Sequence, residues 1–217
     1  GCATTSALDE RDPLEGFNRG VYSFNQTMDG LIFDPIGDLY RAITPDFIER
    51  GVTNFFNNLD DLSVIANEIL QFKFDRASSD AARFVINSTV GLLGFFDVSS
   101  EMGLSKHNED FGQTLAQWGF ESGPYIVVPF FGPASLRDLS SLVVDKGILN
   151  PMFYIEDDMT KSGLLTLNYI DFKSRFSSTN ELVGAAALDE YEFIKNAYFE
   201  KRAYEINDGN VVDFIGE

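Results

Sequence analysis

The chain has 217 residues, a length that allows one large domain or two small ones with a buried core. Its 34 acidic residues exceed its 16 basic residues, and the resulting net charge of −18 repels phosphate backbones, so nucleic acid is not expected as a partner. The same charge argues against electrostatic adsorption to anionic lipid, and no stretch reaches the roughly 18 consecutive apolar residues of a membrane-spanning helix. A body that lies within one leaflet agrees with these features.

Two helices are predicted at the start of the chain. Asp12 followed by Pro13 is typical of a helix start with Asp12 as the N-cap, and apolar residues then recur at positions 14, 17, 21, 24, 28 and 31. This spacing predicts one amphipathic helix with a single apolar stripe. Asp34-Pro35 repeats the start signal and predicts a short second helix that ends near Ile43.

Two more helices are predicted before residue 90. Apolar residues at positions 59, 62, 66 and 69 indicate a third amphipathic helix. Ser78 or Ser79 is the predicted N-cap of a fourth helix, which extends to about Ser88. Between Gly91 and Gly123 regular periodicity fades, apart from a short helix predicted over 110–119.

The segment GPYIVVPFFGP, residues 123–133, is bounded and broken by prolines, which predicts a short strand or hairpin and excludes a long sheet strand. Helices are then expected over 134–146, ended by Gly147, and near 158–176 and 189–204. No repeat and no linker long enough to separate two domains is found. The sequence therefore predicts an all-α, single-domain protein, with the helical domain over 12–206 between a flexible tether, 1–11, and a frayed tail, 207–217.

Catalytic and metal chemistry find little support in the sequence. His107, the only histidine, lies in the polar stretch SKHNED, where a solvated loop histidine is favoured over a catalytic base. No G-x-S-x-G nucleophile elbow and no glycine-rich nucleotide-binding pattern occurs. One histidine and one cysteine offer little to a transition metal. We therefore expect no enzyme activity, no metal and no cofactor.

The only cysteine, Cys2, precedes a small, polar and charged segment. A lone thiol cannot form an internal disulfide, which leaves a chance residue, a reactive thiol or an attachment point. Its position favours attachment, with Gly1-Cys2 as the end of a bacterial lipobox and Cys2 as the lipid anchor.

Five blocks of sequence resemble the VacJ/MlaA family of outer-membrane lipoproteins. They are DPLEGFNRGVYSFNQ (12–26), GVTNFFNNLDD (51–61), ARFVINSTVGLLGFFD (82–97), DFGQTLAQWGFESGPYIVVPFFGPASLRD (110–138) and AYFEKR (197–202). They cover most of the chain in the family's order, with the weakest match over about 150–189. Ala3 after Cys2 is also what outer-membrane sorting of such lipoproteins favours.

The resemblance implies a fold and a function. The fold is a ring of amphipathic helices around a central polar channel, held in the periplasmic leaflet of the Gram-negative outer membrane. The function is removal of misplaced phospholipids from the outer leaflet and their transfer to a periplasmic lipid carrier protein, often by a protein bound to a trimeric porin. The alternative is a lipid-anchored adaptor that holds porins or envelope proteins without conducting lipid. From periodicity alone, an ordinary soluble core would account for the apolar stripes.

Six residues are the predicted channel or passage residues. Asn25 is expected near the channel wall, and Gly123 opens the segment that could form a flap at the channel mouth, unless prolines make it a rigid buried loop. Asp138, Ser141 and Asp145 fall at i, i+3 and i+7 and share a helical face, which in this family resembles an acidic channel wall. Their alternative is a set of solvated surface charges. Lys161 is the predicted cation for a lipid phosphate.

Overall fold

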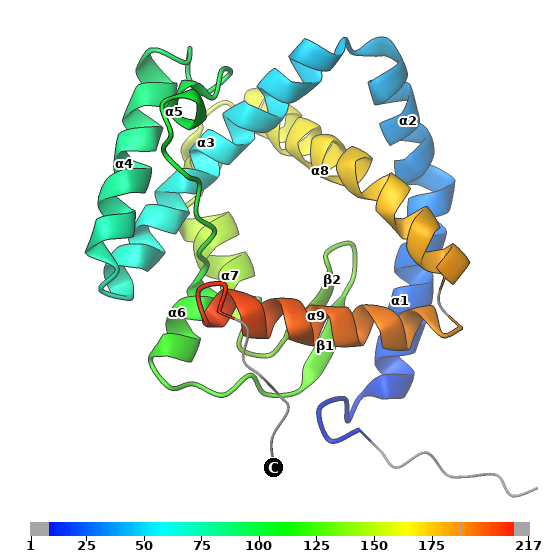
Figure 1. Cartoon of the computed structure of the whole chain (residues 1–217). Helices are drawn as coiled ribbons and strands as arrows, with labels where there is room; N and C mark the ends of the chain where they lie inside the picture. The colour runs from blue at the N-terminus through cyan, green and yellow to red at the C-terminus, as the bar shows by residue number, and fades with distance from the viewer. Residues whose placement is uncertain (1–8, 187, 211–217) are drawn as a thin grey trace, which may run out of the picture.

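The computed structural model describes residues 9–186 and 188–210, and for residues 176–186 it describes the backbone alone. Cys2, most of the predicted tether and the end of the predicted tail therefore lie outside the described residues. The described chain is helical apart from one short hairpin, which confirms the all-α prediction. The helices form a ring (Figure 1), in which α1 and α2 make one side, α3 crosses the top and α9 runs along the bottom.

The element bounds in chain order are α1 Glu15–Met28, a π-helical turn Asp29–Phe33, α2 Asp34–Ile43, α3 Asp46–Leu70, α4 Phe74–Thr89, α5 Val98–Glu101, α6 Phe111–Gln117, β1 Tyr125–Val128, β2 Gly132–Ser135, α7 Leu139–Val143, a second π-helical turn Val144–Ile148, a 3-10 turn Pro151–Tyr154, α8 Asp158–Ala186 and α9 Glu190–Ile206. Helix α4 packs along α3, and α2 packs against α8. The first pairing joins neighbouring helices, and the second joins helices that are more than 100 residues apart in the chain.

Several predicted boundaries are wrong. Helix α1 begins at Glu15 without a side-chain cap, and Asp12 is instead buried, accepting a hydrogen bond of 2.7 Å from Asn18 Nδ2. Helix α4 begins at Phe74, before the predicted serine caps, and Ser78 Oγ donates to the Phe74 carbonyl within the helix. The helix predicted from residue 134 starts only at 139, because 132–135 pairs as a strand.

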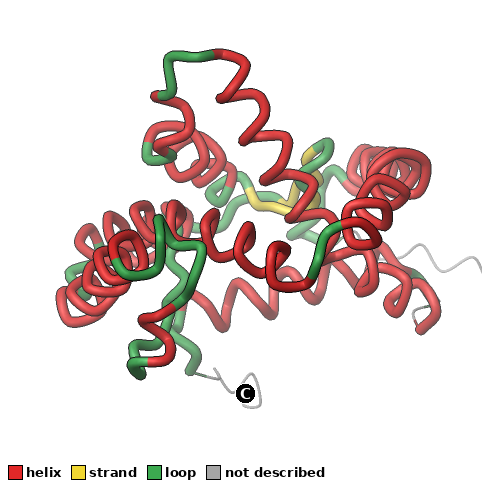
Figure 2. The backbone as a smooth tube through the Cα atoms, turned by 90° about the horizontal axis from the view of Figure 1, so that it is seen from above, coloured by secondary structure: helices red, strands yellow, loops and turns green. Residues whose placement is uncertain are grey.

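The hairpin predicted within 123–133 is present, and its second strand ends at Ser135. Its antiparallel strands pair Tyr125 with Ser135 and Val128 with Gly132. Tyr125 and Val127 are buried, and Tyr191 of α9 is buried with them. Seen from above, the strands lie near the centre with helices on both sides (Figure 2). The hairpin is therefore well packed on one face, and a flap function stays a prediction.

Several amphipathic helices expose apolar residues and bury polar ones, which is the reverse of the pattern in a soluble protein. Most of the apolar stripe is exposed, with Phe17 of α1 at 58% and Leu31 of the π-helical turn at 71%, although Val21 packs against the buried hairpin residues. Asn18 and Asn25 of α1 are buried instead. Among the described residues, far more buried side chains are polar or charged than apolar. An ordinary soluble core therefore does not account for the stripe, since soluble proteins bury such residues. No described helix is both long and apolar enough to cross a membrane.

Candidate functional site

A cluster of opposite charges joins three distant parts of the chain. Arg202 of α9 lies with Nη1 2.6 Å from Asp110 Oδ2, and its Nε is 2.9 Å from Asp138 Oδ2. Asp110 is the N-cap of α6, where it also accepts a hydrogen bond from the Gln113 backbone N–H, and Asp138 precedes α7. We call Asp110, Asp138 and Arg202 the arginine cluster. It fastens α6, α7 and α9 to one another.

The electrostatics of the arginine cluster favour the charged forms. Burial by itself would raise the pKa values of Asp110 and Asp138, but Arg202 together with other donors, Gln113 for Asp110 and Arg137 and Tyr198 for Asp138, holds both below the usual carboxyl range. Burial would likewise lower the pKa of Arg202, and the two carboxylates raise it instead. The cluster is thus a partly buried ion triad, with Asp138 buried and Asp110 half-buried.

Gly112 is required by how closely these groups approach. A Cβ atom at this position would lie 2.5 Å from Asp138 Oδ1 and 2.8 Å from Arg202 Nη2. Real side chains do not come so near, so any larger residue at 112 must displace the ion pair. The glycine of the DFGQ block therefore has a packing reason that the sequence alone does not reveal.

Ser141 and Asp145 are linked to the same cluster through α6. Ser141 Oγ donates to Asp110 Oδ1 at 3.2 Å and accepts from the Gly112 backbone N–H at 2.9 Å. Asp145 Oδ2 accepts from the Phe111 backbone N–H at 2.8 Å, and Asp145 Oδ1 accepts from Asn67 Nδ2 of α3 at 2.8 Å. The structure thus brings Asp138, Ser141 and Asp145 together at one end of α6.

These carboxylates are not surface charges. Asp138 is 9% exposed and Asp145 is 5% exposed, so their interpretation as solvated groups is wrong. Burial raises the pKa of Asp145, although the Phe111 and Asn67 donors act in the opposite direction. The pKa of Asp145 is raised, whereas that of Asp138 is lowered, and no described cation is paired with Asp145. Whether either residue lines a lipid passage stays a prediction.

Asn25 contacts the turn of the hairpin, and Gly123 lies just before its first strand. Asn25 is buried on α1, donates from Nδ2 to the Val128 carbonyl at 3.0 Å, and accepts from the Phe130 backbone N–H at 2.8 Å. It therefore satisfies both backbone groups at the hairpin turn. Gly123 has a φ of +67°, and a Cβ there would lie 3.1 Å from Leu136 Cβ, so a side chain at 123 would be strained.

We expect Asn25→Ala to loosen the hairpin turn. The substitution leaves the Phe130 N–H and the Val128 carbonyl without their partner, a loss of about 1–3 kcal/mol for buried groups. Amide hydrogen exchange at 126–131 should become faster, while exchange in α3 stays unchanged. Gln26→Ala, which alters the exposed neighbouring amide on the same helix, is the control. Equal protection of the turn in both variants would contradict the role of Asn25.

Two other predicted positions lie elsewhere. Lys161 belongs to α8, and its Nζ lies 3.6 Å from Oδ1 of Asp158 on the same helix. The structure therefore records no contact between Lys161 and the arginine cluster. His107 is not a solvated loop histidine, because its Nδ1 lies 2.7 Å from Oδ2 of the fully buried Asp80.

Asp110, Arg202 and Asn67 are not among the six passage residues predicted from the sequence. The signal that was available is polar periodicity, since buried polar residues recur at helical spacing. Asp80, Arg83 and Asn87 of α4 lie at i, i+3 and i+7, and all three are buried. Such a stripe predicts a polar inner face only once the apolar stripe is known to face outward.

The family described as MlaA lipoprotein matches residues 10–205. The chain belongs to the MlaA lipoprotein family. A solved structure from work on the structural basis for maintenance of bacterial outer membrane lipid asymmetry superposes with a TM-score of 0.77 at 28% identity, covering 90% of this chain and 99% of that one. The resemblance found in the sequence is thus confirmed.

Relatives of this MlaA chain come from several bacteria. A protein of Escherichia coli strain K12, named intermembrane phospholipid transport system lipoprotein MlaA, is 30% identical over 217 aligned residues, covering 97% of this chain and 85% of the relative. The protein of the same name from Haemophilus influenzae is 29% identical, covering 98% and 88%. A Rickettsia felis protein described as uncharacterized is 33% identical, covering 90% and 78%. The two MlaA names describe transport and not catalysis.

Proposed function

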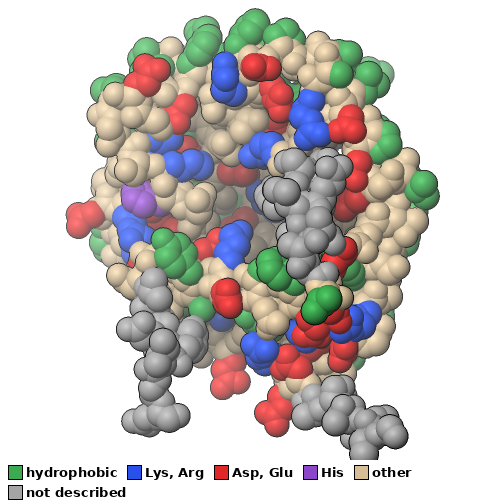
Figure 3. All heavy atoms as spheres, turned by 45° about the vertical axis from the view of Figure 1, so that its right-hand side comes forward, with side chains coloured by type: hydrophobic (Ala, Val, Ile, Leu, Met, Phe, Trp, Pro, Cys, Tyr) green, Lys and Arg blue, Asp and Glu red, His purple; other side chains and the backbone are tan. Residues whose placement is uncertain are grey.

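We propose that this chain removes phospholipids from the outer leaflet of the outer membrane and passes them through a polar channel to a periplasmic lipid carrier. One observation carries the proposal: a ring of helices in an MlaA family member buries polar side chains and exposes apolar ones. Figure 3 shows charged side chains gathered around a hollow, while hydrophobic side chains line the upper and right-hand edges. This arrangement fits a protein with lipid outside and a polar head group inside.

The exposed apolar face of the ring is more stable against lipid than against water. A large apolar side chain exposed to water forgoes about 1.5–3 kcal/mol of burial, and lipid tails supply that burial without protein packing. Leu39, Ile43 and Phe47 extend the exposed apolar surface from α2 into α3. This exposed apolar surface on amphipathic helices supports a place for the ring within one leaflet.

The predicted passage residues acquire more specific roles in this proposal. The Asp138 carboxylate is already paired with Arg202 and Arg137, so it supports the channel wall by holding the arginine cluster in place. Asp145, which no described cation neutralises, is the carboxylate that an ammonium head group would meet. Asn25 and Gly123 shape the hairpin at the channel mouth. Lys161 would contact lipid phosphate from α8.

Anchoring and partners complete the proposal. Cys2 is the only cysteine of a chain whose family is described as lipoproteins, and we assign it the lipid anchor. The anchored protein would lie in the periplasmic leaflet of the outer membrane. A trimeric porin would contact part of its exposed apolar surface, and the periplasmic carrier would receive lipid at the opposite end of the channel.

The test uses the parent bacterium with this gene deleted and the full precursor restored from a plasmid. We expect the restored chain to lower outer-leaflet phospholipid, measured on intact cells, several-fold toward the level of the undeleted strain. Asp145→Asn should lose much of this effect at equal protein abundance, and the substitution keeps the side-chain shape and an acceptor oxygen for the Phe111 N–H. Asp171→Asn, a buried carboxylate of α8 bound to Thr53, is the matched control.

One outcome would favour the adaptor instead. If the restored chain reaches the outer membrane and binds porin, but outer-leaflet phospholipid stays as high as in the deleted strain, lipid conduction is wrong. Equal activity of Asp145→Asn and Asp171→Asn would remove Asp145 from the passage while leaving the transport proposal in place.

A further inference from the structure

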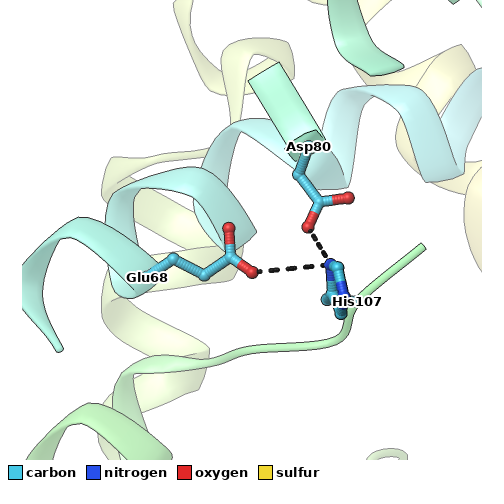
Figure 4. A group of neighbouring side chains, drawn as sticks. All are labelled: Glu68, Asp80 and His107. Carbon is cyan, nitrogen blue, oxygen red and sulfur yellow. Dashed lines mark hydrogen bonds and ion pairs between the residues drawn. The ribbon is translucent and has the colours of Figure 1, made fainter. Parts of the chain in front are cut away.

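Three side chains with metal-binding donors meet between α3, α4 and the segment that follows α5. Glu68 comes from α3, Asp80 from α4 and His107 from the segment between α5 and α6. One donor atom from each lies within 4.8 Å of the other two. His107 Nδ1 is 2.7 Å from Asp80 Oδ2 and 3.8 Å from Glu68 Oε1 (Figure 4).

The two carboxylates are buried without enough donors. Glu68 and Asp80 are both fully buried, yet neither oxygen of Glu68 accepts a hydrogen bond, and Asp80 Oδ1 accepts none either. Buried carboxylates in folded proteins are normally hydrogen-bonded or coordinate a cation. Burial, followed by the nearby Asp80, raises the pKa of Glu68 above its usual range.

The neighbouring cations are engaged elsewhere. Lys73 and Arg76 pair with Glu109 and Asp208, and Lys106 pairs with Asp61. Arg83 directs its guanidinium at Asp97, and only its Nε approaches Asp80 Oδ1, at 3.7 Å.

Together these contacts leave two carboxylates facing one imidazole. We propose that Glu68, Asp80 and His107 bind a divalent transition-metal ion of the Zn²⁺ class. Two carboxylate charges balance a divalent cation, and an imidazole nitrogen with carboxylate oxygens is a donor set that Zn²⁺ accepts. Ca²⁺ is disfavoured, because it takes 6–8 oxygen ligands and this site offers a nitrogen and few oxygens.

The proposed ion has a structural consequence. It ties the segment that carries His107 to the α3–α4 pair, and three residues later the same segment reaches Asp110 of the arginine cluster. Metal binding free energy adds to folding free energy when the ligands assemble only in the folded chain. The bound ion should therefore stabilise the wall of the ring beside α6.

The first experiment is a calorimetric titration of the full chain in detergent micelles, without a histidine tag and freed of metal by chelation, with zinc chloride. We expect one equivalent to bind and the melting temperature to rise. His107→Gln and Asp80→Asn should each weaken binding at least about 10-fold. Asp171→Asn, a buried carboxylate outside the group, should bind as the unsubstituted chain does.

A second measurement needs no substitution. Because the chain has one histidine, a sample labelled with ¹⁵N at histidine shows the signals of a single imidazole. Zinc should shift these signals and saturate at one equivalent. Imidazole signals that respond to pH but not to zinc, or zinc affinity that persists in His107→Gln, would overturn the proposal.

Discussion

Replacing Arg202 with methionine is expected to destabilise the fold by up to about 3–5 kcal/mol, because it leaves Asp110 without a cation and Asp138 with Arg137 alone. Arg202 is the cation that Asp110 and Asp138 share, and its side chain is only 12% exposed. Methionine fills similar space without charge, so lost packing contributes little. The free energy of unfolding, measured by urea titration in micelles at neutral pH, tests this.

Lys201→Met on the same helix is the matched control. Lys201 is exposed and pairs only with Glu205, at 3.4 Å, so its loss should change stability little, as for other surface ion pairs. Equal destabilisation by the two substitutions would show that α9 responds to any lost charge. It would contradict a special role for the arginine cluster.

The contribution of Asp110 to the pH dependence should change sign in the Arg202→Met chain. In the unsubstituted chain the pKa values of Asp110 and Asp138 are lowered, so their stabilising contribution is present above the unfolded value of about 3.9 and is lost as pH falls through the folded values. Without the guanidinium, burial raises the pKa of Asp110, whereas Asp138 keeps Arg137 at 2.8 Å. The Asp110 carboxyl then binds a proton more tightly in the folded variant than in the unfolded chain, so its contribution to stability should grow as pH falls from neutral.

A triple substitution on the exposed apolar face is expected to weaken membrane binding strongly. Leu31, Leu39 and Ile43 are all exposed, and replacing them with serine removes apolar area worth about 4 kcal/mol of transfer to lipid. This corresponds to a roughly 10³-fold lower partition constant. Partition into zwitterionic vesicles, measured by flotation of chains that carry Cys2→Ser, tests the effect without an acyl anchor.

The control replaces three exposed polar residues, Asp46, Arg50 and Glu101, with serine. Its partition should match that of the unsubstituted chain. Because none of the three apolar side chains is buried within the described structure, the helical circular dichroism of the triple variant in micelles should also be unchanged. If the apolar triple variant still floats with the vesicles as fully as its control, the exposed face does not contact lipid.

Local sequence signals were sufficient to predict that most of the helices and the hairpin exist. The Asp34-Pro35 start, the apolar periodicity around Leu62 and the proline-bounded YIVV run correspond to α2, α3 and β1 in the structure. These signals succeed because they act through neighbouring residues: a helix phase or a missing N–H is set within a few positions. The predicted helix starts at Asp12 and Ser78 are wrong. The Asp12 carboxylate accepts a hydrogen bond from Tyr191 of α9, and the Ser78 hydroxyl donates to the Phe74 carbonyl within α4, so neither side chain caps a helix.

The direction of each amphipathic face was decided only by the tertiary structure. Periodicity places Phe17 and Asn18 on different sides of α1, but the choice of which side faces inward depends on the solvent around the whole protein. The arginine cluster joins Asp110 to Arg202 across 92 positions. His107 likewise meets Glu68 and Asp80 only because α3 and α4 pack together beside its loop. Contacts between residues so far apart in the chain are formed by packing of elements, and no local pattern encodes them.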